Sequence, residues 1–127
     1  MMLREVTHEF ILQLARDWRP EGLILTPTKG PCYWYVEKER RGFCCIAVVG
    51  KQRIARSRSL FVHVDHRRQG LARLMVAECM DLAAGMGCRA MDAHANPNSL
   101  HLYETLGFAP VGHNSKLNTT HVFKAFK

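Results

Sequence analysis

The chain has 127 residues, 47% of them hydrophobic, which is enough to bury a core as one folded domain over residues 1–127. Its 18 Lys and Arg outnumber its 11 Asp and Glu, giving a formal net charge of +7. No apolar run approaches the ~20 residues of a membrane-spanning helix, and the N-terminus lacks a signal peptide's apolar core. We therefore expect a cytoplasmic protein without membrane contact, whose charge serves a nucleic acid, an acidic protein or a phosphorylated ligand.

The cysteines indicate reduced thiols rather than a disulfide framework. They are odd in number, two are adjacent, and none forms the CxxC pair of a zinc ribbon. The histidine spacings lack a carboxylate or thiolate in fixed register, so we expect no metal site. Mostly buried positions are expected for Cys32, Cys44, Cys45, Cys79 and Cys88.

The N-terminal third predicts a strand, a helix and a hairpin. A short strand is expected over Met2–Val6, and Thr7 is expected to cap a helix over His8–Arg16. The buried side of that helix contains Phe10, Ile11, Leu14 and Ala15. A loop rich in Pro, Gly and Thr follows over Asp17–Pro31. Two strands then form an antiparallel hairpin, Cys32–Glu37 and Phe43–Val49.

A strand and a long helix occupy the middle of the chain. Ile54–Val64 is expected to be an interior strand with both faces covered, because Leu60, Val62 and Val64 alternate with Phe61 and His63. After Gly70 the period becomes helical for roughly four turns, until Gly85 and Gly87 end the helix. The predicted buried stripe consists of Leu71, Leu74, Met75, Cys79, Leu82 and Met86.

The basic turn between them suits a polyphosphate. Arg67 and Arg68 bring two guanidiniums to a helix N-terminus, where unpaired N–H groups and the helix dipole also attract an anion. Gly70 lets the backbone approach a ligand closely.

The last third predicts a further strand over Cys88–Ala93, a short helix over Ser99–Leu106, and strands over Phe108–His113 and Thr119–Phe126. Together these elements describe a mixed α/β sheet. One parallel crossover, through the long helix, is expected to be right-handed.

Two motifs resemble signatures of the GNAT N-acetyltransferase superfamily. Val62–Ala72 reads VHVDHRRQGLA, in which Arg67, Gly70 and Ala72 fill the Gln/Arg-x-x-Gly-x-Gly/Ala acetyl-CoA signature. Asn96–Phe108 reads NPNSLHLYETLGF and is similar to the element Asn-x-x-Ala/Ser-x-x-x-Tyr-x-x-x-Gly-Phe. Two motifs in the right order are more specific than either alone.

The resemblance implies an α/β fold with a mixed, mostly antiparallel sheet, one parallel pair splayed at the acyl-CoA site, and flanking helices. It implies an acyl-CoA-dependent N-acyltransferase that moves acetyl from acetyl-CoA to a primary amine, by direct attack in a ternary complex. The implied cofactor-binding residues are Val62 and Val64 for the pantetheine arm, Arg67, Arg68, Gln69, Gly70, Leu71, Ala72 and Arg73 for the phosphates, and Asn96 and Ser99 beside the arm.

Tyr103 is the residue that the resemblance places at the chemistry. A thiolate leaves when an amine attacks a thioester, and a phenol of pKa about 10 can act as the general acid toward it. The alternative for Tyr103 is ordinary core packing. Asn96 and Ser99 have a similar alternative, because both suit any helix start, and Ser99 is expected to cap the short helix.

The general base is unassigned. Many relatives carry a glutamate on the strand before the glycine turn, where this chain has Arg56, Ser57, Arg58 and Ser59. Substitutes for that glutamate are His63, Asp65, Glu37 and His94.

Two rival functions stay open. The net charge and the arginines at 53, 56 and 58 favour a nucleic-acid-binding or nucleic-acid-modifying protein on the same fold. The missing glutamate favours a catalytically silent CoA-binding module. The partners expected first are acetyl-CoA and an anionic or protein amine; a homodimer is left open.

Overall fold

A computed structural model describes residues 1–19, 25–26 and 30–127 of the chain. Its helices are α1 (His8–Trp18), α2 (Leu71–Gly85) and α3 (Leu100–Thr105), with a 3-10 helix at Val64–His66. Its strands are β1 (Leu3–Val6), β2 (Cys32–Glu37), β3 (Gly42–Val49), β4 (Ile54–Val62), β5 (Ala90–Ala95), β6 (Ala109–Asn114) and β7 (Thr119–Ala125).

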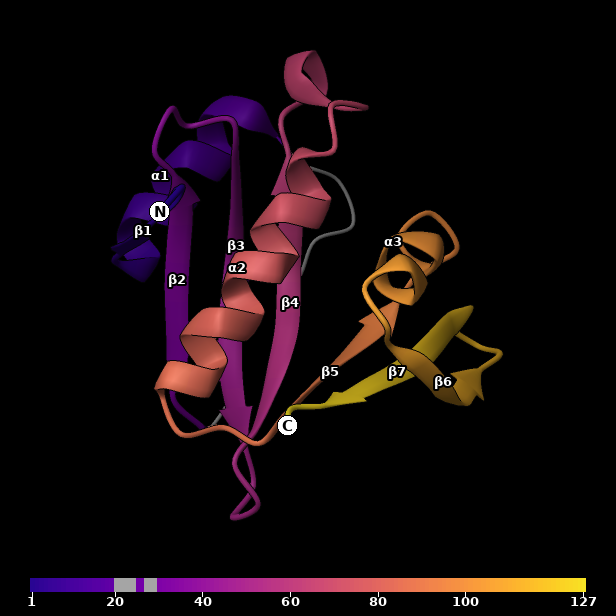
Figure 1. Cartoon of the computed structure of the whole chain (residues 1–127). Helices are drawn as coiled ribbons and strands as arrows, with labels where there is room; N and C mark the ends of the chain where they lie inside the picture. Colours follow the sequence, from indigo (N-terminus) through magenta and orange to yellow (C-terminus); the bar gives the residue numbers. More distant parts are fainter. Residues whose placement is uncertain (20–24, 27–29) are drawn as a thin grey trace.

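All seven strands form one sheet in the order β1-β2-β3-β4-β5-β7-β6 (Figure 1). Five neighbouring pairs are antiparallel, and β4 and β5, which α2 connects, are parallel. The mixed, mostly antiparallel sheet with one parallel pair is therefore confirmed. Most of the loop expected over Asp17–Pro31 lies outside the described residues, although α1 continues to Trp18.

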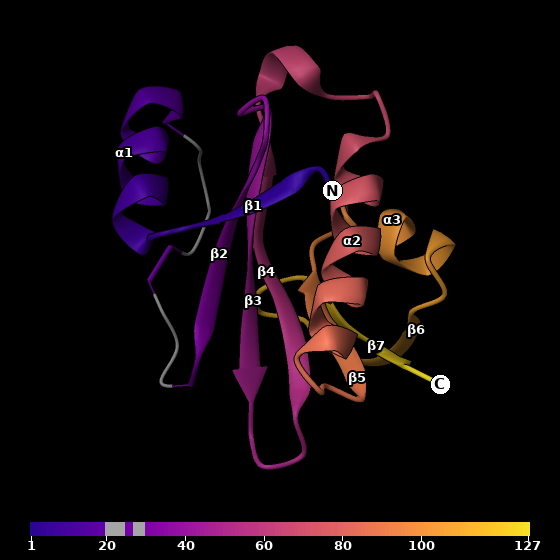
Figure 2. The same ribbon diagram turned by 60° about the vertical axis from the view of Figure 1, so that its left-hand side comes forward.

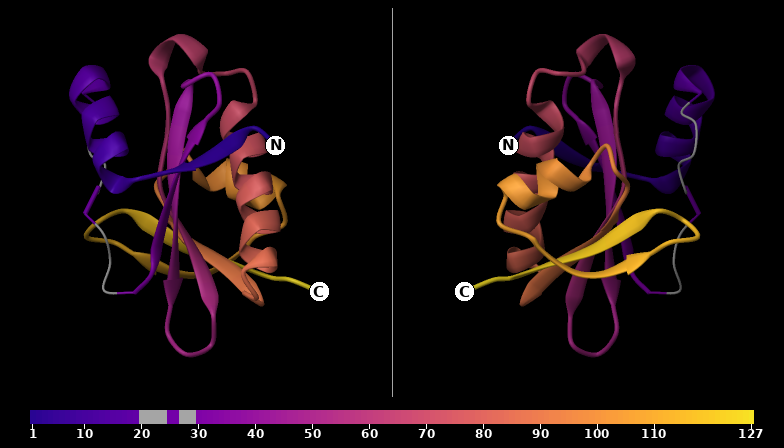
Figure 3. Two further views of the ribbon diagram at one scale, coloured as in Figure 1. Left: turned by 90° about the vertical axis from the view of Figure 1, so that its left-hand side faces the viewer. Right: turned by 90° about the vertical axis from the view of Figure 1, so that its right-hand side faces the viewer.

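Helices cover both faces of the sheet. Figures 2 and 3 show α1 on one side, with α2 and α3 on the other. The predicted cap is confirmed, since the Thr7 hydroxyl accepts the Phe10 N–H at 3.1 Å. Ile11 and Leu14 pack against Trp34 and other side chains of β2 and β3. No helix in the described part of the chain is long and apolar enough to cross a membrane.

Helix α2 buries a stripe that is rotated from the predicted one and is formed by Leu71, Met75, Val76, Cys79 and Ala83. The prediction for Leu74 is wrong, because its side chain is 54% exposed. At 100° per residue, Leu74 lies about 140° around the helix from the centre of the stripe. The buried stripe is therefore turned toward Val76 and Ala83 and away from Leu74.

Strand β4 ends earlier than predicted. Val64 belongs to the 3-10 helix instead of the strand and is 65% exposed. The His63 ring nitrogen accepts the Asp65 N–H at 3.2 Å, and the His66 N–H bonds the His63 carbonyl at 2.8 Å. These local bonds take the place of strand pairing.

Strand β5 begins two residues later than predicted, at Ala90. The Cys88 N–H bonds back to the Ala83 carbonyl at 3.0 Å, which closes the end of α2. Gly87, with φ +86°, supplies the left-handed residue that this closure requires. The strand therefore starts only after the helix cap is complete.

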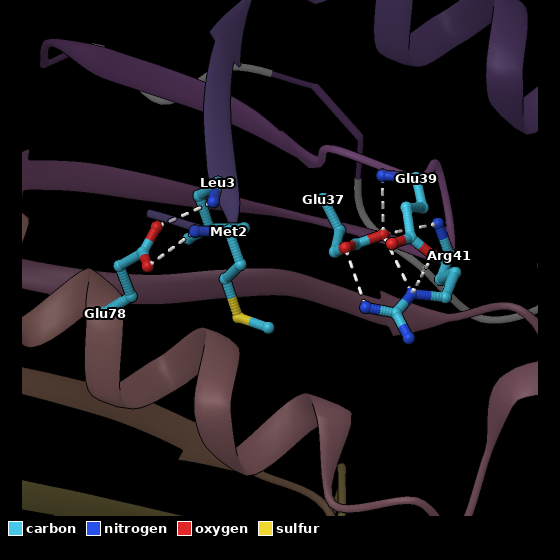
Figure 4. Close-up of polar contacts among 6 residues, drawn as sticks. All are labelled: Met2, Leu3, Glu37, Glu39, Arg41 and Glu78. Atoms are coloured by element: carbon cyan, nitrogen blue, oxygen red, sulfur yellow. Dashed lines mark hydrogen bonds and ion pairs between the residues drawn. The ribbon is translucent and has the colours of Figure 1, made fainter.

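Two carboxylates, the partly buried Glu78 and the fully buried Glu37, hold strands and turns in place near β1 and β2 (Figure 4). From α2, Glu78 accepts the backbone N–H groups of Met2 at 2.9 Å and Leu3 at 2.7 Å, which ties edge strand β1 to the helix. At the β2–β3 turn, Glu37 accepts two guanidinium bonds from Arg41, at 3.1 and 2.9 Å. The Arg41 carbonyl in turn accepts the His63 N–H at 2.8 Å, so this turn positions the end of β4.

We expect Glu78→Ala to lower the free energy of unfolding by about 1–3 kcal/mol, because it leaves two backbone donors without their acceptor. Glu78→Gln keeps one acceptor oxygen and should lose less. Asp81→Ala, which removes an exposed carboxylate from the same helix, is the control and should change stability little. Urea unfolding measures all three; equal losses for Glu78→Ala and Asp81→Ala would contradict the role of Glu78.

Candidate functional site

The site begins where two parallel strands part. β4 and β5 pair from Ile54 opposite Ala90 to Ser57 opposite Ala93, and diverge beyond that point (Figure 1). Just past it, Ser59 has φ +55°, and the register between β3 and β4 shifts as in a β-bulge. Among the described strands, β4 therefore has no neighbour on the β5 side from residue 58 to residue 62.

A pocket of about 220 Å³ lies at the end of this stretch of β4. Its lining consists of Val62, His66, Arg67, Arg68, Gly70, Leu71, Ala72, Arg73 and Leu102. Seven of these residues were predicted to bind the cofactor. His66 and Leu102 were not, because only the fold brings the 3-10 helix and α3 beside the turn.

The turn presents backbone N–H groups at the N-terminus of α2. Arg68 and Gly70 both have left-handed backbones, with φ +63° and +73°. Gly70 is the N-cap, and no side chain caps the helix there. A Cβ at Gly70 would meet no atom within 4 Å, so its backbone conformation, not the available space, favours glycine. An anion in the pocket would find free donors and the positive end of the helix dipole.

The three arginines of the turn are placed differently. The Arg67 Nε donates to the Val62 carbonyl at 2.9 Å, and its guanidinium lies 5.1 Å from the centre of the Phe61 ring. The Arg73 Nε reaches the Thr105 hydroxyl at 3.4 Å. Arg68 is exposed and has no side-chain hydrogen bond to any described residue. The structure thus leaves Arg68 as the more available of the two guanidiniums predicted at residues 67 and 68.

Four predicted cofactor-binding residues do not line the pocket: Val64, Gln69, Asn96 and Ser99. The prediction that the Ser99 side chain caps α3 is wrong. Instead, the Asn96 side-chain oxygen accepts the Ser99 N–H at 2.9 Å, and the Ser99 hydroxyl donates to the Asn96 main-chain carbonyl at 3.4 Å. Asn96 therefore forms the turn before α3, as Asn commonly does.

Tyr103 lies on the same face of the sheet, at the level where the strands part. Its hydroxyl is 2.9 Å from the hydroxyl of Ser57, the last β4 residue paired with β5. Its ring is buried and packs edge-on against Phe108. Burial raises the pKa of the Tyr103 phenol well above its ordinary value of 10, so the phenol keeps its proton at neutral pH.

A polar cluster that the sequence did not predict lies on the opposite face. Arg56 donates two bonds to Asp92, at 3.1 and 2.9 Å, and the His121 Nε2 lies 2.8 Å from the same carboxylate. The His94 ring stacks on His121 with centroids 4.6 Å apart. A buried acid in the apolar strand AMDAHA was the available signal, because buried carboxylates need partners.

The pKa values in this cluster follow from those contacts. Burial alone would raise the pKa of Asp92, but the bonds from Arg56 and His121 together hold it below its ordinary value of 3.8. Burial, with the charges of Arg56 and His121, lowers the pKa of His94 below 6.5. The His94 imidazole is therefore neutral at pH 7.

The other three candidates for the base are less suitable. Glu37 is fully buried, and the guanidinium of Arg41 lowers its pKa, so the carboxylate is fully occupied. The His63 ring packs edge-on against Trp18 at 5.1 Å. Asp65 is largely exposed in the 3-10 helix. Only His94 is both neutral and one residue past the point where β4 and β5 part.

The fold is similar to those of solved acetyltransferases. Spermidine N-acetyltransferase from Vibrio cholerae, in complex with CoA and spermine, aligns with a TM-score of 0.75 at 16% identity, over 97% of this chain and 94% of that one. N-acetylglutamate synthase from Neisseria gonorrhoeae, complexed with coenzyme A and N-acetyl-glutamate, gives 0.76 at 14% identity, over 98% of this chain and 35% of that one.

A dodecameric spermidine N-acetyltransferase structure from Vibrio cholerae gives a TM-score of 0.72 at 16% identity, over 97% of this chain and 92% of that one. No curated protein sequence matches the chain. The model of the acetyltransferase (GNAT) family matches residues 3–108, which include both sequence motifs and the strand pair that parts. The chain therefore belongs to the GNAT acetyltransferase family.

Proposed function

We propose that this protein transfers an acetyl group from acetyl-CoA to a primary amine, by direct attack of the amine on the thioester. The observation that supports the proposal is that three parts of the site form one continuous path. The turn at residues 67–72, the stretch of β4 that no longer pairs with β5 and the phenol of Tyr103 follow one another along one face of the sheet.

Coenzyme A would bind along this path. Its diphosphate would accept N–H groups at the start of α2, with Arg68 and Arg73 supplying positive charge. The pantetheine arm would add to the edge of β4, as an extended peptide adds to a sheet. From Val62 to Ser57 that edge spans about 16 Å at 3.3 Å per residue. Asn96 uses its side-chain oxygen within the turn, which leaves its amide N–H groups for the arm.

Two groups on opposite faces would then move protons. Tyr103 would donate to the departing sulfur as general acid. His94, neutral at pH 7, would take the proton of the attacking amine, directly or through water. An amine with a pKa of about 10.4 is mostly protonated at neutral pH, so this second transfer is required.

The cysteine environments support direct attack over a covalent relay through an acyl-enzyme. Cys44 lies 3.5 Å from Cys79, and that hydrogen bond, together with burial, raises the pKa of its thiol. Burial raises the pKa of Cys45 to about 12. Neither thiol supplies the thiolate that nucleophilic catalysis requires.

The contacts of the arginines favour the transferase over a nucleic-acid-binding protein. Arg53 donates to the Gly87 carbonyl at 3.3 Å and to the Met86 carbonyl, and so caps the end of α2. Arg56 is paired with Asp92. Two of the three arginines that suggested nucleic acid thus have partners within the chain, and phosphate contacts would have to break those bonds.

The donor site can be tested by calorimetry with CoA. Arg68→Glu reverses an exposed charge in the pocket and should weaken CoA binding at least about tenfold, since a hydrogen bond to a charged group contributes ~1.5–3 kcal/mol. Lys116→Glu makes the same change of charge in the distant β6–β7 turn and should leave the affinity unchanged. Equal effects of the two variants would show that net charge alone attracts the ligand.

Turnover distinguishes the enzyme from a silent CoA-binding module. With amines and acetyl-CoA, Tyr103→Phe should lower the rate of thiol release by about 10²-fold or more, while CoA binding persists. Ser57→Ala removes the same hydrogen bond but keeps the phenol, so it should lower the rate much less. If both variants lose equal activity, Tyr103 serves packing, and if the wild type binds CoA without releasing thiol, the silent module is correct.

The role of His94 can be tested by a pH profile. The groups that face His94 are Arg56, Asp92 and the His121 ring, and the lowered pKa of His94 keeps it neutral until the pH falls below 6.5. At constant free-amine concentration, kcat/KM of the wild type should fall only below that pH. His94→Gln should lower kcat about 10²-fold and abolish this acid limb. His113→Gln, which changes an exposed histidine, should preserve the limb.

A further inference from the structure

The sheet face that carries His94 is only partly covered. Helix α1 packs on β2 and β3, through Ile11 and Leu14 against Trp34, Val36 and Phe43. Trp18 at the end of α1 also lies against Phe61 near the end of β4, with ring centroids 6.0 Å apart. Apart from this contact, no described helix packs on the same face of β4, β5 and β7. In Figure 1, α1 lies at the β1–β3 end of the sheet, away from β5, β7 and β6. The split between β4 and β5 therefore opens toward this face, opposite α2.

The strands that border the split contain little negative charge. In strands β3 to β7, all of which are described, Asp92 is the only acidic residue. Its two oxygens already accept Arg56 and His121, so its negative charge is neutralised within the cluster. A polycationic acceptor would find no free carboxylate in these strands.

Arg58 is the remaining cation beside the split. It pairs with Cys45 of β3, whose side chain packs on the α1 side, and its charge acts on the Cys45 thiol. It is partly exposed and forms no ion pair with a described residue. It is also the first β4 residue after the last pair with β5, just as His94 is the first on β5.

Arg58 and His94 thus stand on either side of the opening. Paired strands lie about 4.8 Å apart, and this gap widens as the strands diverge. A small acceptor with its amine at His94 could therefore place a carboxylate on Arg58. The guanidinium would bind that carboxylate through two parallel N–H donors, whereas an uncharged acceptor would leave Arg58 unpaired.

We propose that the acceptor is an amino acid, whose carboxylate binds Arg58 while its amine lies beside His94 and faces the thioester through the split. This inference rests on the proposed function and narrows it to a substrate class. Arg56 is a positioning residue in this arrangement, because its bonds to Asp92 hold the carboxylate that orients His121 and, through stacking, His94.

The test compares matched acceptors by CoA thiol release: amino acids, their amides, the corresponding decarboxylated amines, and spermidine. We expect kcat/KM to be at least about tenfold higher for an amino acid than for its amide or amine. Arg58→Met should reduce this preference by about 10- to 100-fold, mainly through KM, because it removes a charged hydrogen-bonding partner. Arg58→Lys should retain part of the preference for amino acids, since lysine keeps the positive charge but lacks the two parallel N–H donors of the guanidinium.

The control is Lys51→Met, which removes one positive charge from the turn at the far end of β4 and should keep the preference. CoA binding by each variant verifies that it is folded. Equal turnover of amino acids and amides, a preference for spermidine, or equal loss on all acceptors in Arg58→Met would each overturn the inference and leave the proposed function standing. Absence of thiol release with every acceptor would overturn both.

Discussion

The divergence of β4 from β5 after Ser57 is the feature on which the rest of the site depends. A continuous parallel pair would leave no free strand edge, and the turn before α2 would have nothing to deliver a ligand toward. The left-handed Ser59 and the shifted register between β3 and β4 accompany the divergence. A non-glycine residue in that conformation costs roughly 1–2 kcal/mol, so the surrounding β3 and α2 packing must hold it in place.

The divergence also connects the two faces of the sheet at one level. Side chains alternate along a strand, so Ser57 faces α2 and Tyr103, while Arg58 faces the opposite side with His94. The proposed proton donor, Tyr103, and the proposed proton acceptor, His94, are thereby separated by the thickness of the sheet. In a shared pocket Tyr103 and His94 would bond to each other. On opposite faces, both could instead contact a ligand that lies across the split.

The strand, turn and helix of the donor site could be predicted from the sequence because their signals are local: β-branched alternation, then a basic glycine turn, then helical periodicity. The errors were local as well. Val64 lies outside the strand, in a turn where the His63 ring accepts the Asp65 N–H. At the start of α3, the Asn96 side chain rather than the Ser99 side chain accepts a backbone N–H. In each case a polar side chain formed a local hydrogen bond with the backbone in place of the expected pattern. The sequence does not indicate which of several nearby polar side chains will form such a bond.

The cluster on the acceptor side could not be predicted in the same way, because its members come from three strands. Arg56, Asp92 and His121 are 36 and 29 residues apart in sequence, and only the order β4-β5-β7 makes them neighbours. A buried Asp92 nonetheless requires partners. In a chain with 18 Lys and Arg, basic side chains are the partners to expect. Once Arg56 and His121 satisfy it, Asp92 has no charge left for a substrate. Arg58, which has no such carboxylate partner among the described residues, is then the cation on this face that the proposed acceptor would bind.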